Sequence, residues 1–209
     1  NTIGGIIGIH IPHPELSLPI GLSFYTFRNL SYLFDIYLSK VSAQRNFLTF
    51  SVYSTMFPYT SAGPIVRYTD IETQLKQRTI NISKFGIGAE LFVKGLAKKV
   101  LLADNLSVLY SSICGHPQMS VFTSWLGILA YTMQLYFDFS GYSDMAIGLG
   151  KMLGFDFNKN FDYPYISTSV SEFWRRWHIS LGSWFRDYIY IPLGGNRVST
   201  LKHIRNILV

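Results

Sequence analysis

The stretch SVSEFWRRWHISLGSWFRDYIYIPLGGNR, residues 169–197, is the most strongly patterned part of this sequence. It begins with Ser169, followed three residues later by Glu172, a capping-box signature that predicts a helix starting there. The helical period then places large apolar side chains on one side of a single continuous helix. These are Phe173, Trp174, Trp177, Leu181, Trp184, Phe185 and Tyr188. The opposite side carries Arg175, Arg176, Ser183, Arg186 and Asp187.

The composition is typical of a membrane protein. Of the 209 residues, 48% are hydrophobic, 16% are aromatic and only 14% are charged, and the mean hydropathy is +0.21. A soluble domain carries about 25% charged residues. The net charge of +6 is spread in small Lys and Arg clusters between apolar runs, as in membrane proteins with basic cytoplasmic loops. This distribution argues against a nucleic-acid-binding protein.

The helix predicted for residues 169–197 carries too many charges to cross a bilayer. Each of its charged side chains would cost about 3 kcal/mol at the membrane centre, whereas each large apolar residue returns only about 0.5 kcal/mol. We therefore expect this helix to lie at the surface of the lipid bilayer or to line a wet cavity, with its aromatic side against lipid or protein.

His178 lies at the edge of the aromatic side, one turn before Gly182. Because glycine has no side chain, the space over one edge of the imidazole is left open to another group. The neighbouring Arg175 and Arg176 disfavour a second positive charge, which predicts a neutral ring that can act as a base near pH 7. The residues alone favour equally an interfacial histidine held by a backbone carbonyl.

Two segments are predicted to cross the membrane. Residues 16–38 and residues 121–137 are apolar and long enough to span all or most of the hydrocarbon core. The first contains Arg28 and Asp35, which lie two helical turns apart. The two charges therefore share one face, which should point into the protein rather than toward lipid.

Residues 46–66 contain no charge, but Pro58 and the Gly63-Pro64 pair interrupt any helix. We expect a bent or re-entrant element whose irregular backbone is buried in protein.

Two carboxylates, Asp138 and Asp144, follow the second predicted crossing. A carboxylate at membrane depth is costly and is functional by default, which makes both of them candidates for contact with substrate. On a helix they would point about 240° from each other, so a paired acid and base is not implied. We expect separate partners, for example the arginines of the 169–197 helix.

Several catalytic signatures are missing from the sequence. It contains no Gly-x-Ser-x-Gly elbow, no His-Glu-x-x-His zinc helix and no Gly-Lys-Ser/Thr phosphate loop. His10 and His13 flank prolines without a cysteine or carboxylate cluster beside them, which predicts a surface loop rather than a metal site. Catalysis in this segment is therefore expected to need no serine nucleophile, no metal and no cofactor.

Several blocks of the chain resemble the membrane-bound O-acyltransferase (MBOAT) family, in the family's order. They are LPIGLSFYTF (18–27), GPIVR (63–67), KKVLLAD (98–104), YFDFSGYSD (136–144), FWRRWHISL (173–181) and PLGG (192–195). The resemblance covers nearly the whole chain. It is closest to the branch of bacterial alginate O-acetyltransferases, which includes relatives that modify peptidoglycan or teichoic acid.

The resemblance implies an all-α, polytopic membrane protein, in which transmembrane, re-entrant and interfacial helices form a ring around a funnel. Residues 1–209 would be part of one such domain in the bacterial inner membrane. The implied activity is transfer of an acyl group, such as acetyl, from a cytoplasmic thioester donor toward a hydroxyl of an exported or cell-wall polysaccharide. The resemblance also implies an extracytoplasmic acetyltransferase as partner.

By resemblance, His178 matches one of two histidines associated with activity in the family. The other lies in a Trp-His-Gly block, whereas the Trp177-His178 pair of this chain is followed by Ile179. We therefore expect residues 1–209 to lack the C-terminal portion of the domain and to be inactive alone. Arg175 and Arg176 are expected to contact the phosphates of the donor or structural carboxylates.

A non-enzymatic carrier or scaffold for polysaccharide export is the alternative. Such a protein would also need buried charges and bent helices, so Arg28 and Asp138 do not distinguish the two functions. The helix that bears His178 and the acyl-transfer motifs favour the enzyme.

Overall fold

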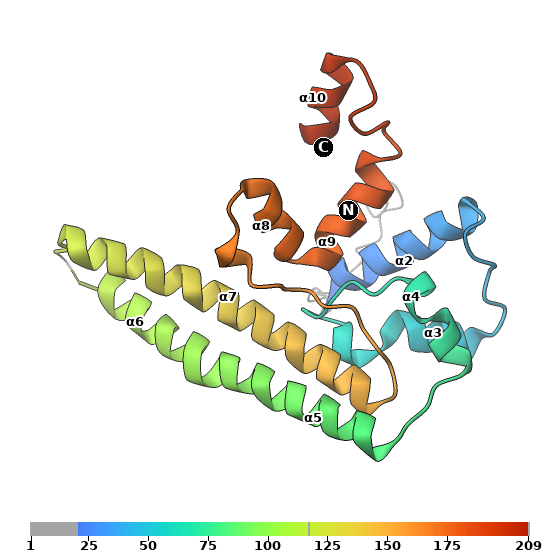
Figure 1. Ribbon diagram of the computed structural model, residues 1–209, viewed down its shortest axis with the longest axis horizontal. Helices are drawn as coiled ribbons and strands as arrows, with labels where there is room; N and C mark the ends of the chain where they lie inside the picture. Colours follow the sequence, from blue (N-terminus) through green and yellow to red (C-terminus); the bar gives the residue numbers. More distant parts are fainter. Residues whose placement is uncertain (1–20, 117, 209) are drawn as a thin grey trace, which may run out of the picture.

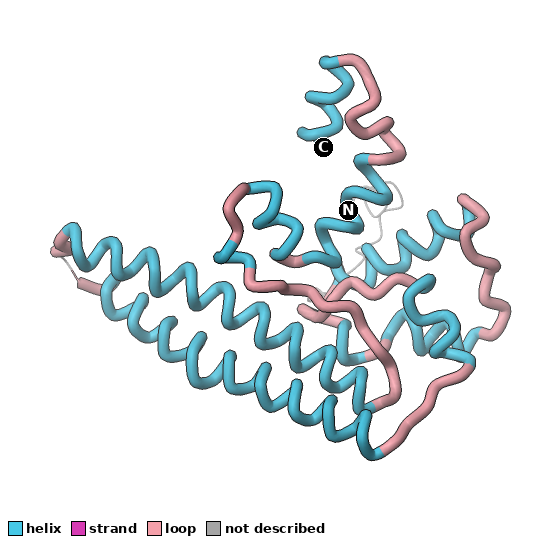
Figure 2. Tube along the Cα trace, viewed as in Figure 1, coloured by secondary structure: helices cyan, strands magenta, loops and turns pink. Residues whose placement is uncertain are grey.

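The computed structural model describes residues 21–116 and 118–208, and within these two ranges every regular element is a helix. The predicted all-α class is therefore confirmed for the described residues. Figure 1 shows a long antiparallel pair of helices, an N-terminal group beside one end of the pair, and a C-terminal group above it. Helices make up most of the trace, and irregular segments connect the three parts (Figure 2).

The helices of the three parts follow one another along the chain. The N-terminal group contains α2 (Leu22–Tyr37), α3 (Phe47–Thr55), the 3-10 turn η1 (Phe57–Tyr59) and α4 (Tyr68–Lys76). The long pair contains α5 (Ile82–Ala97), the π-helical turn η2 (Lys98–Ala103), α6 (Asp104–Cys114) and α7 (Val121–Met152). The C-terminal group contains the 3-10 turn η3 (Pro164–Ile166), α8 (Val170–Arg176), α9 (Ile179–Phe185), the π-helical turn η4 (Arg186–Tyr190) and α10 (Thr200–Leu208).

Glycines let α5 and α7 approach at backbone distance. Gly88 and Gly95 lie seven residues apart on α5, and they face Gly148 and Gly141, with the same spacing, on α7. A Cβ atom at Gly95 would lie 2.5 Å from the carbonyl oxygen of Gly141, and one at Gly88 would lie 2.7 Å from that of Gly148. Only glycine fits at this spacing, because any side chain would push the two helices apart.

The first predicted crossing does place its charges inward. Arg28 and Asp35 of α2 are each 1% exposed. The Arg28 guanidinium donates to the carbonyl oxygens of Tyr53 and Tyr59, at 3.3 and 3.5 Å, and lies 4.2 Å from the centre of the Tyr59 ring. Asp35 accepts a 2.7 Å hydrogen bond from the Tyr188 hydroxyl. The prediction that both charges face the protein is confirmed.

The segment of residues 46–66 is bent, as expected from its prolines. It forms α3 and η1, and the chain then runs on without regular structure through the buried Gly63 and Pro64. The hydroxyls of Ser61 and Tyr142 hydrogen-bond, which ties this segment to α7.

Neither predicted crossing is confirmed. Among residues 21–116 and 118–208, no helix combines the length and the apolar character required of a membrane span. The described part of the first segment is the 16-residue α2. The second segment is the first half of α7, which continues as one 32-residue helix through Asp138 and Asp144.

Candidate functional site

The helix predicted from Ser169 begins where expected but is not continuous. The Ser169 hydroxyl accepts a 3.1 Å hydrogen bond from the Glu172 amide, so the predicted cap is confirmed. The helix then ends at Arg176, and His178 adopts a left-handed backbone conformation with φ 43° before α9 starts. The prediction of one uninterrupted amphipathic helix is therefore wrong.

Residues 160–162 cause this break by replacing helical hydrogen bonds. In a continuous helix, the amides of Ile179 and Ser180 would donate to carbonyls four residues earlier. Instead the Ile179 amide donates to the Asn160 carbonyl at 2.9 Å, and the Ser180 amide donates to Asn160 Oδ1 at 3.1 Å. The Arg176 carbonyl accepts from the Asp162 amide at 2.9 Å. A loop distant in sequence thus supplies the partners that stop α8 and start α9.

The aromatic side of α9 and η4 packs on α2. Trp184 is buried, and its indole N–H donates to the Phe27 carbonyl at 3.0 Å. Its ring lies edge-on to that of Phe27 with centroids 4.7 Å apart. The predicted aromatic side therefore faces protein here, whereas Trp174 on α8 is exposed.

The His178 ring is 8% exposed and lies among aromatic rings. Its centroid is 4.7 Å from that of Phe139, edge to face, and 6.4 Å from that of Phe161. Burial lowers the pKa of His178 to about 4, and a hydrogen bond to its own backbone opposes that shift. The predicted neutral ring is thus supported, although the cause is burial rather than the neighbouring arginines.

This depressed pKa predicts a loss of stability in mild acid. The folded state favours the neutral ring. The stability that this preference contributes is fully present above the ordinary pKa of 6.5 and is lost as the pH falls toward 4. Over this pH range the free energy of unfolding decreases by about 3 kcal/mol. Thermal unfolding of the full-length protein at pH 7.5 and 5 should therefore show a larger decrease in Tm for the wild type than for His178→Gln. An equal decrease in both proteins would contradict this assignment.

An apolar cavity of about 270 Å³ opens beside the imidazole. Its walls are Trp174, Trp177, His178, Leu181, Gly182 and Phe185. A Cβ atom at Gly182 would meet only the Trp174 carbonyl oxygen, at 3.6 Å, so the open space predicted over this glycine is present. The cavity is apolar rather than watery, because aromatic rings of α8 and α9 form its walls.

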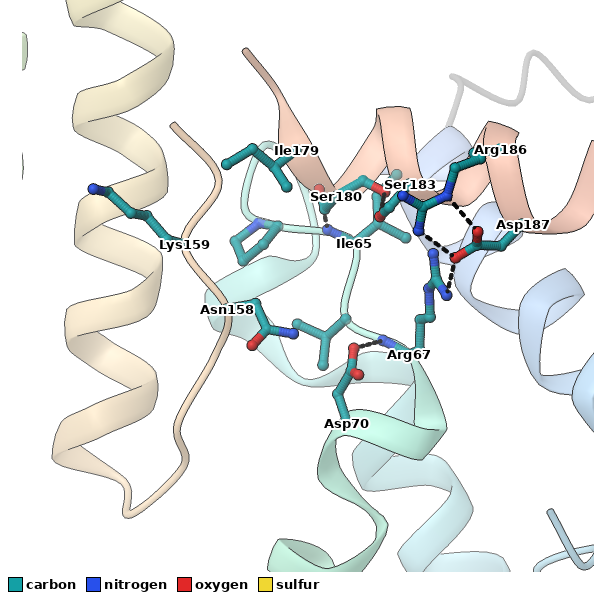
Figure 3. A pocket seen from close by; sticks show the side chains of 12 residues that line it. Ile65, Arg67, Asp70, Asn158, Lys159, Ile179, Ser180, Ser183, Arg186 and Asp187 are labelled. Carbon is teal, nitrogen blue, oxygen red and sulfur yellow. Dashed lines mark hydrogen bonds and ion pairs between the residues drawn. The ribbon is translucent and has the colours of Figure 1, made fainter. Parts of the chain in front are cut away.

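A second, polar cavity of about 250 Å³ lies on the Ser180 side of α9 (Figure 3). At one end, Arg67 and Arg186 converge on Asp187, with contacts of 2.8 Å from Arg67 Nη1 and 2.7 Å from Arg186 Nε. Asp70 accepts from the Arg67 amide at 3.1 Å and adds a second carboxylate. At this end two cations and two carboxylates balance, and Lys159, which also lines the cavity, pairs with Asp162 at 2.6 Å.

The two predicted carboxylates form ion pairs with lysines, not with the arginines of the 169–197 stretch. Asp138 pairs with Lys99 at 2.6 Å, and Asp144 pairs with Lys98 at 2.6 Å. Asp138 is 47% exposed and Asp144 is 23% exposed. Both pairs join α7 to η2, and both lie outside the two cavities described above.

The two predicted arginines differ in their contacts. Arg176 pairs with Glu172 at 2.9 Å and donates to the Asp162 carbonyl at 3.1 Å, which attaches α8 to the preceding loop. Arg175 is exposed, and its side chain forms no ion pair within the described part of the chain. Arg175 is therefore the one of the two that is free to meet a ligand.

The sequence did not point to Asn160 or Ser180, although they contact or flank His178. Ser180 lies two residues after the histidine and could have been noticed for its hydroxyl. Asn160 had no such signal, because its role depends on a contact across twenty residues. Among residues 21–116 and 118–208, no group of three or more metal-ligating side chains gathers. His10 and His13 lie outside the described residues.

Comparison with known proteins finds relatives among bacterial acyltransferases. The chain is 51% identical over 195 residues to the probable alginate O-acetylase AlgI of Pseudomonas aeruginosa, covering 93% of this chain and 38% of that protein. It is 34% identical to the peptidoglycan O-acetyltransferase of Helicobacter pylori, over 96% of this chain and 43% of that protein. It is 30% identical to the teichoic acid D-alanyltransferase of Bacillus subtilis, over 87% of this chain and 47% of that protein.

These relatives are much longer than the present sequence. The chain spans about two fifths of the length of the alginate O-acetylases that it matches. The model of the membrane-bound O-acyltransferase family matches residues 18–209, which includes the break at His178 and both cavities. The chain therefore belongs to the membrane-bound O-acyltransferase family, MBOAT.

Proposed function

We propose that the full-length protein is an O-acyltransferase that moves acetyl groups from a cytoplasmic thioester donor to hydroxyls of an exported or cell-wall polysaccharide. Two relatives are named for O-acetylation, of alginate and of peptidoglycan, and a third is named a teichoic acid D-alanyltransferase. The alginate O-acetylases are 51% identical to this chain and the other two relatives are 34% and 30% identical, so alginate or a related polysaccharide is the proposed acceptor. The proposal places the protein in the bacterial inner membrane, with several membrane passes.

The neutral imidazole beside an open cavity carries this proposal. His178 is buried enough to stay unprotonated near pH 7, yet it lines the cavity over Gly182. A neutral imidazole can remove the proton from an acceptor hydroxyl as that oxygen attacks a thioester carbonyl. The carbon–sulfur bond then breaks, the thiolate leaves and takes up a proton, and the acetyl group remains as an ester.

The other proposed contacts concern the donor and the partner. Arg175 is proposed to meet the phosphates of the donor, because it is exposed. The other three predicted residues already have ion-pair partners: Arg176, Asp138 and Asp144. Their contact with substrate remains a prediction. The reaction is proposed to use the thioester as a substrate without a further cofactor. An extracytoplasmic acetyltransferase is the proposed partner.

Acetyl transfer by the isolated full-length protein tests the proposed activity. The protein would be reconstituted in lipid vesicles with labelled acetyl-coenzyme A outside and alginate oligosaccharide inside, with and without the partner protein. We expect the label to appear as an ester on the oligosaccharide. The carrier alternative predicts a different result, in which the labelled compound crosses the membrane with its thioester intact and no ester forms.

A further inference from the structure

We propose that Asn160 and Ser180 are positioning residues, which hold His178 in its left-handed backbone conformation and in the tautomer whose Nε2 is free to accept a proton. This inference rests on the proposed function, because it assigns a role to the surroundings of the proposed base. It concerns residues on two separate segments, the loop after α7 and the first turn of α9.

Asn160 acts as a helix cap supplied from a distant loop. His178 precedes the first residue of α9, and its own side chain forms no capping hydrogen bond. The first amides of a helix lack partners within the helix. Asn160 accepts from the first two, Ile179 at 2.9 Å and Ser180 at 3.1 Å. Because it is 1% exposed, water does not substitute for it in this role.

This cap supports a backbone conformation that is costly for histidine. A non-glycine residue in the left-handed region is strained and persists where surrounding contacts determine its conformation. The residues on both sides of His178 are fixed to the same loop. Arg176 accepts from the Asp162 amide at 2.9 Å, and Ile179 donates to Asn160. The histidine backbone is therefore held from both directions.

The hydrogen bonds around Ser180 determine the tautomer. The Ser180 amide can only donate, so the Asn160 atom that faces it is Oδ1. That oxygen also accepts the single hydroxyl hydrogen of Ser180, at 2.9 Å. The Ile65 amide donates to one lone pair of the Ser180 hydroxyl, at 3.0 Å. The other lone pair faces His178 Nδ1 at 3.5 Å.

The Ser180 hydroxyl makes its shorter contact, 2.9 Å, as donor to Asn160 Oδ1, so the hydrogen between Ser180 and His178 is assigned to the imidazole nitrogen. Nδ1 is therefore the protonated nitrogen of His178, and Nε2 keeps the basic lone pair. No acid or base among the described residues forms an ion pair with the ring, and its other close neighbours are the Phe139 and Phe161 rings. Among the described residues, Ser180 is thus the polar side chain at this imidazole, beside the hydrogen bond that the ring makes with its own backbone.

Substitutions of Ser180 in the full-length protein test the hydroxyl separately from the fold. Ser180→Ala removes the acceptor at Nδ1 but keeps the amide that bonds Asn160. We expect kcat for acetyl transfer to fall about tenfold with little change in KM, because the basic tautomer is no longer favoured. Ser180→Thr keeps the hydroxyl and should restore kcat to within about twofold of wild type. Ser167→Ala is the matched control, since its hydroxyl donates only to the nearby Pro164 carbonyl.

Asn160→Asp tests the hydrogen-bond path from residue 160 through Ser180 to His178, by its effect on the pH dependence of kcat. Asn160 Nδ2 has no hydrogen-bond partner in the described part of the chain, so the change removes no bond there and adds a negative charge. That charge would lie two hydrogen bonds from the imidazole and favour its protonated form. We expect the acidic limb of the kcat profile to move about one pH unit toward neutral.

The two proposals fail in different ways. Unchanged kcat in Ser180→Ala, an equal loss in Ser180→Thr, or an unmoved acidic limb in Asn160→Asp would each overturn the positioning role. If His178→Ala itself transfers acetyl groups at the wild-type rate, the proposed function of the histidine is overturned instead.

Discussion

Replacing His178 with alanine in the full-length protein is expected to lower kcat for acetyl transfer by about 10²- to 10⁴-fold. This is the usual contribution of a positioned general base, and alanine cannot accept the hydroxyl proton. His178→Gln should lose as much, because glutamine keeps polarity and similar size but has no basic nitrogen. The measurement is the initial rate of ester formation on alginate oligosaccharide, with the membrane abundance of each variant determined in parallel.

His203 offers a matched control for these substitutions. It lies on α10, where its Nε2 is 3.2 Å from the Tyr190 hydroxyl, and it does not line the cavity beside His178. His203→Ala is expected to leave kcat within about twofold of wild type, as surface substitutions away from a site usually do. Wild-type rates in both His178 variants, at equal abundance, would leave His178 with a packing role only.

The substitution Gly88→Ala is expected to destabilise the protein by about 2–3 kcal/mol, the cost of overpacking a close contact. The added Cβ atom would lie 2.7 Å from the Gly148 carbonyl oxygen and 2.8 Å from the Met152 amide nitrogen. Both are backbone atoms of α7, so the overlap is relieved only if α5 moves away from α7. The measurement is the free energy of unfolding of the full-length protein, from thermal or denaturant curves in detergent.

Gly86→Ala is the control, on the same helix and with the same change. A Cβ atom there meets no other atom within 4 Å. Alanine is a better helix former than glycine, so this variant should be stabilised by about 0.5–1 kcal/mol. If the two variants have the same stability, the glycines of α5 do not determine its packing against α7.

Local sequence patterns predicted the local features of the fold correctly. The cap at Ser169, the inward direction of Arg28 and Asp35, and the open space over Gly182 all follow from spacings of three, four or seven residues. These spacings determine which side chains meet within one helix, so the sequence suffices for them. The neutral state of His178 was also predicted, but from charge repulsion between neighbours rather than from burial.

Features that depend on distant segments were predicted wrongly or missed. Periodicity indicated one helix across Trp177 and His178, since no proline or glycine marks a break there. The partners of Asp138 and Asp144 were expected on the 169–197 stretch, yet they are Lys99 and Lys98. The side chains that one helix presents to another depend on how the helices cross, which spacing within one segment does not determine.

The sequence by itself determined where the patterned helix starts, because capping is a property of a short segment. Its family motifs, which are also short, indicated the all-helical class and marked His178 as the candidate base. Only the tertiary structure decided that His178 stands at a helix break, between an apolar and a polar cavity, with Asn160 and Ser180 beside it. The physical reason is competition for hydrogen bonds: the loop at residues 160–162 offers the α8–α9 backbone better-placed partners than its own helix would.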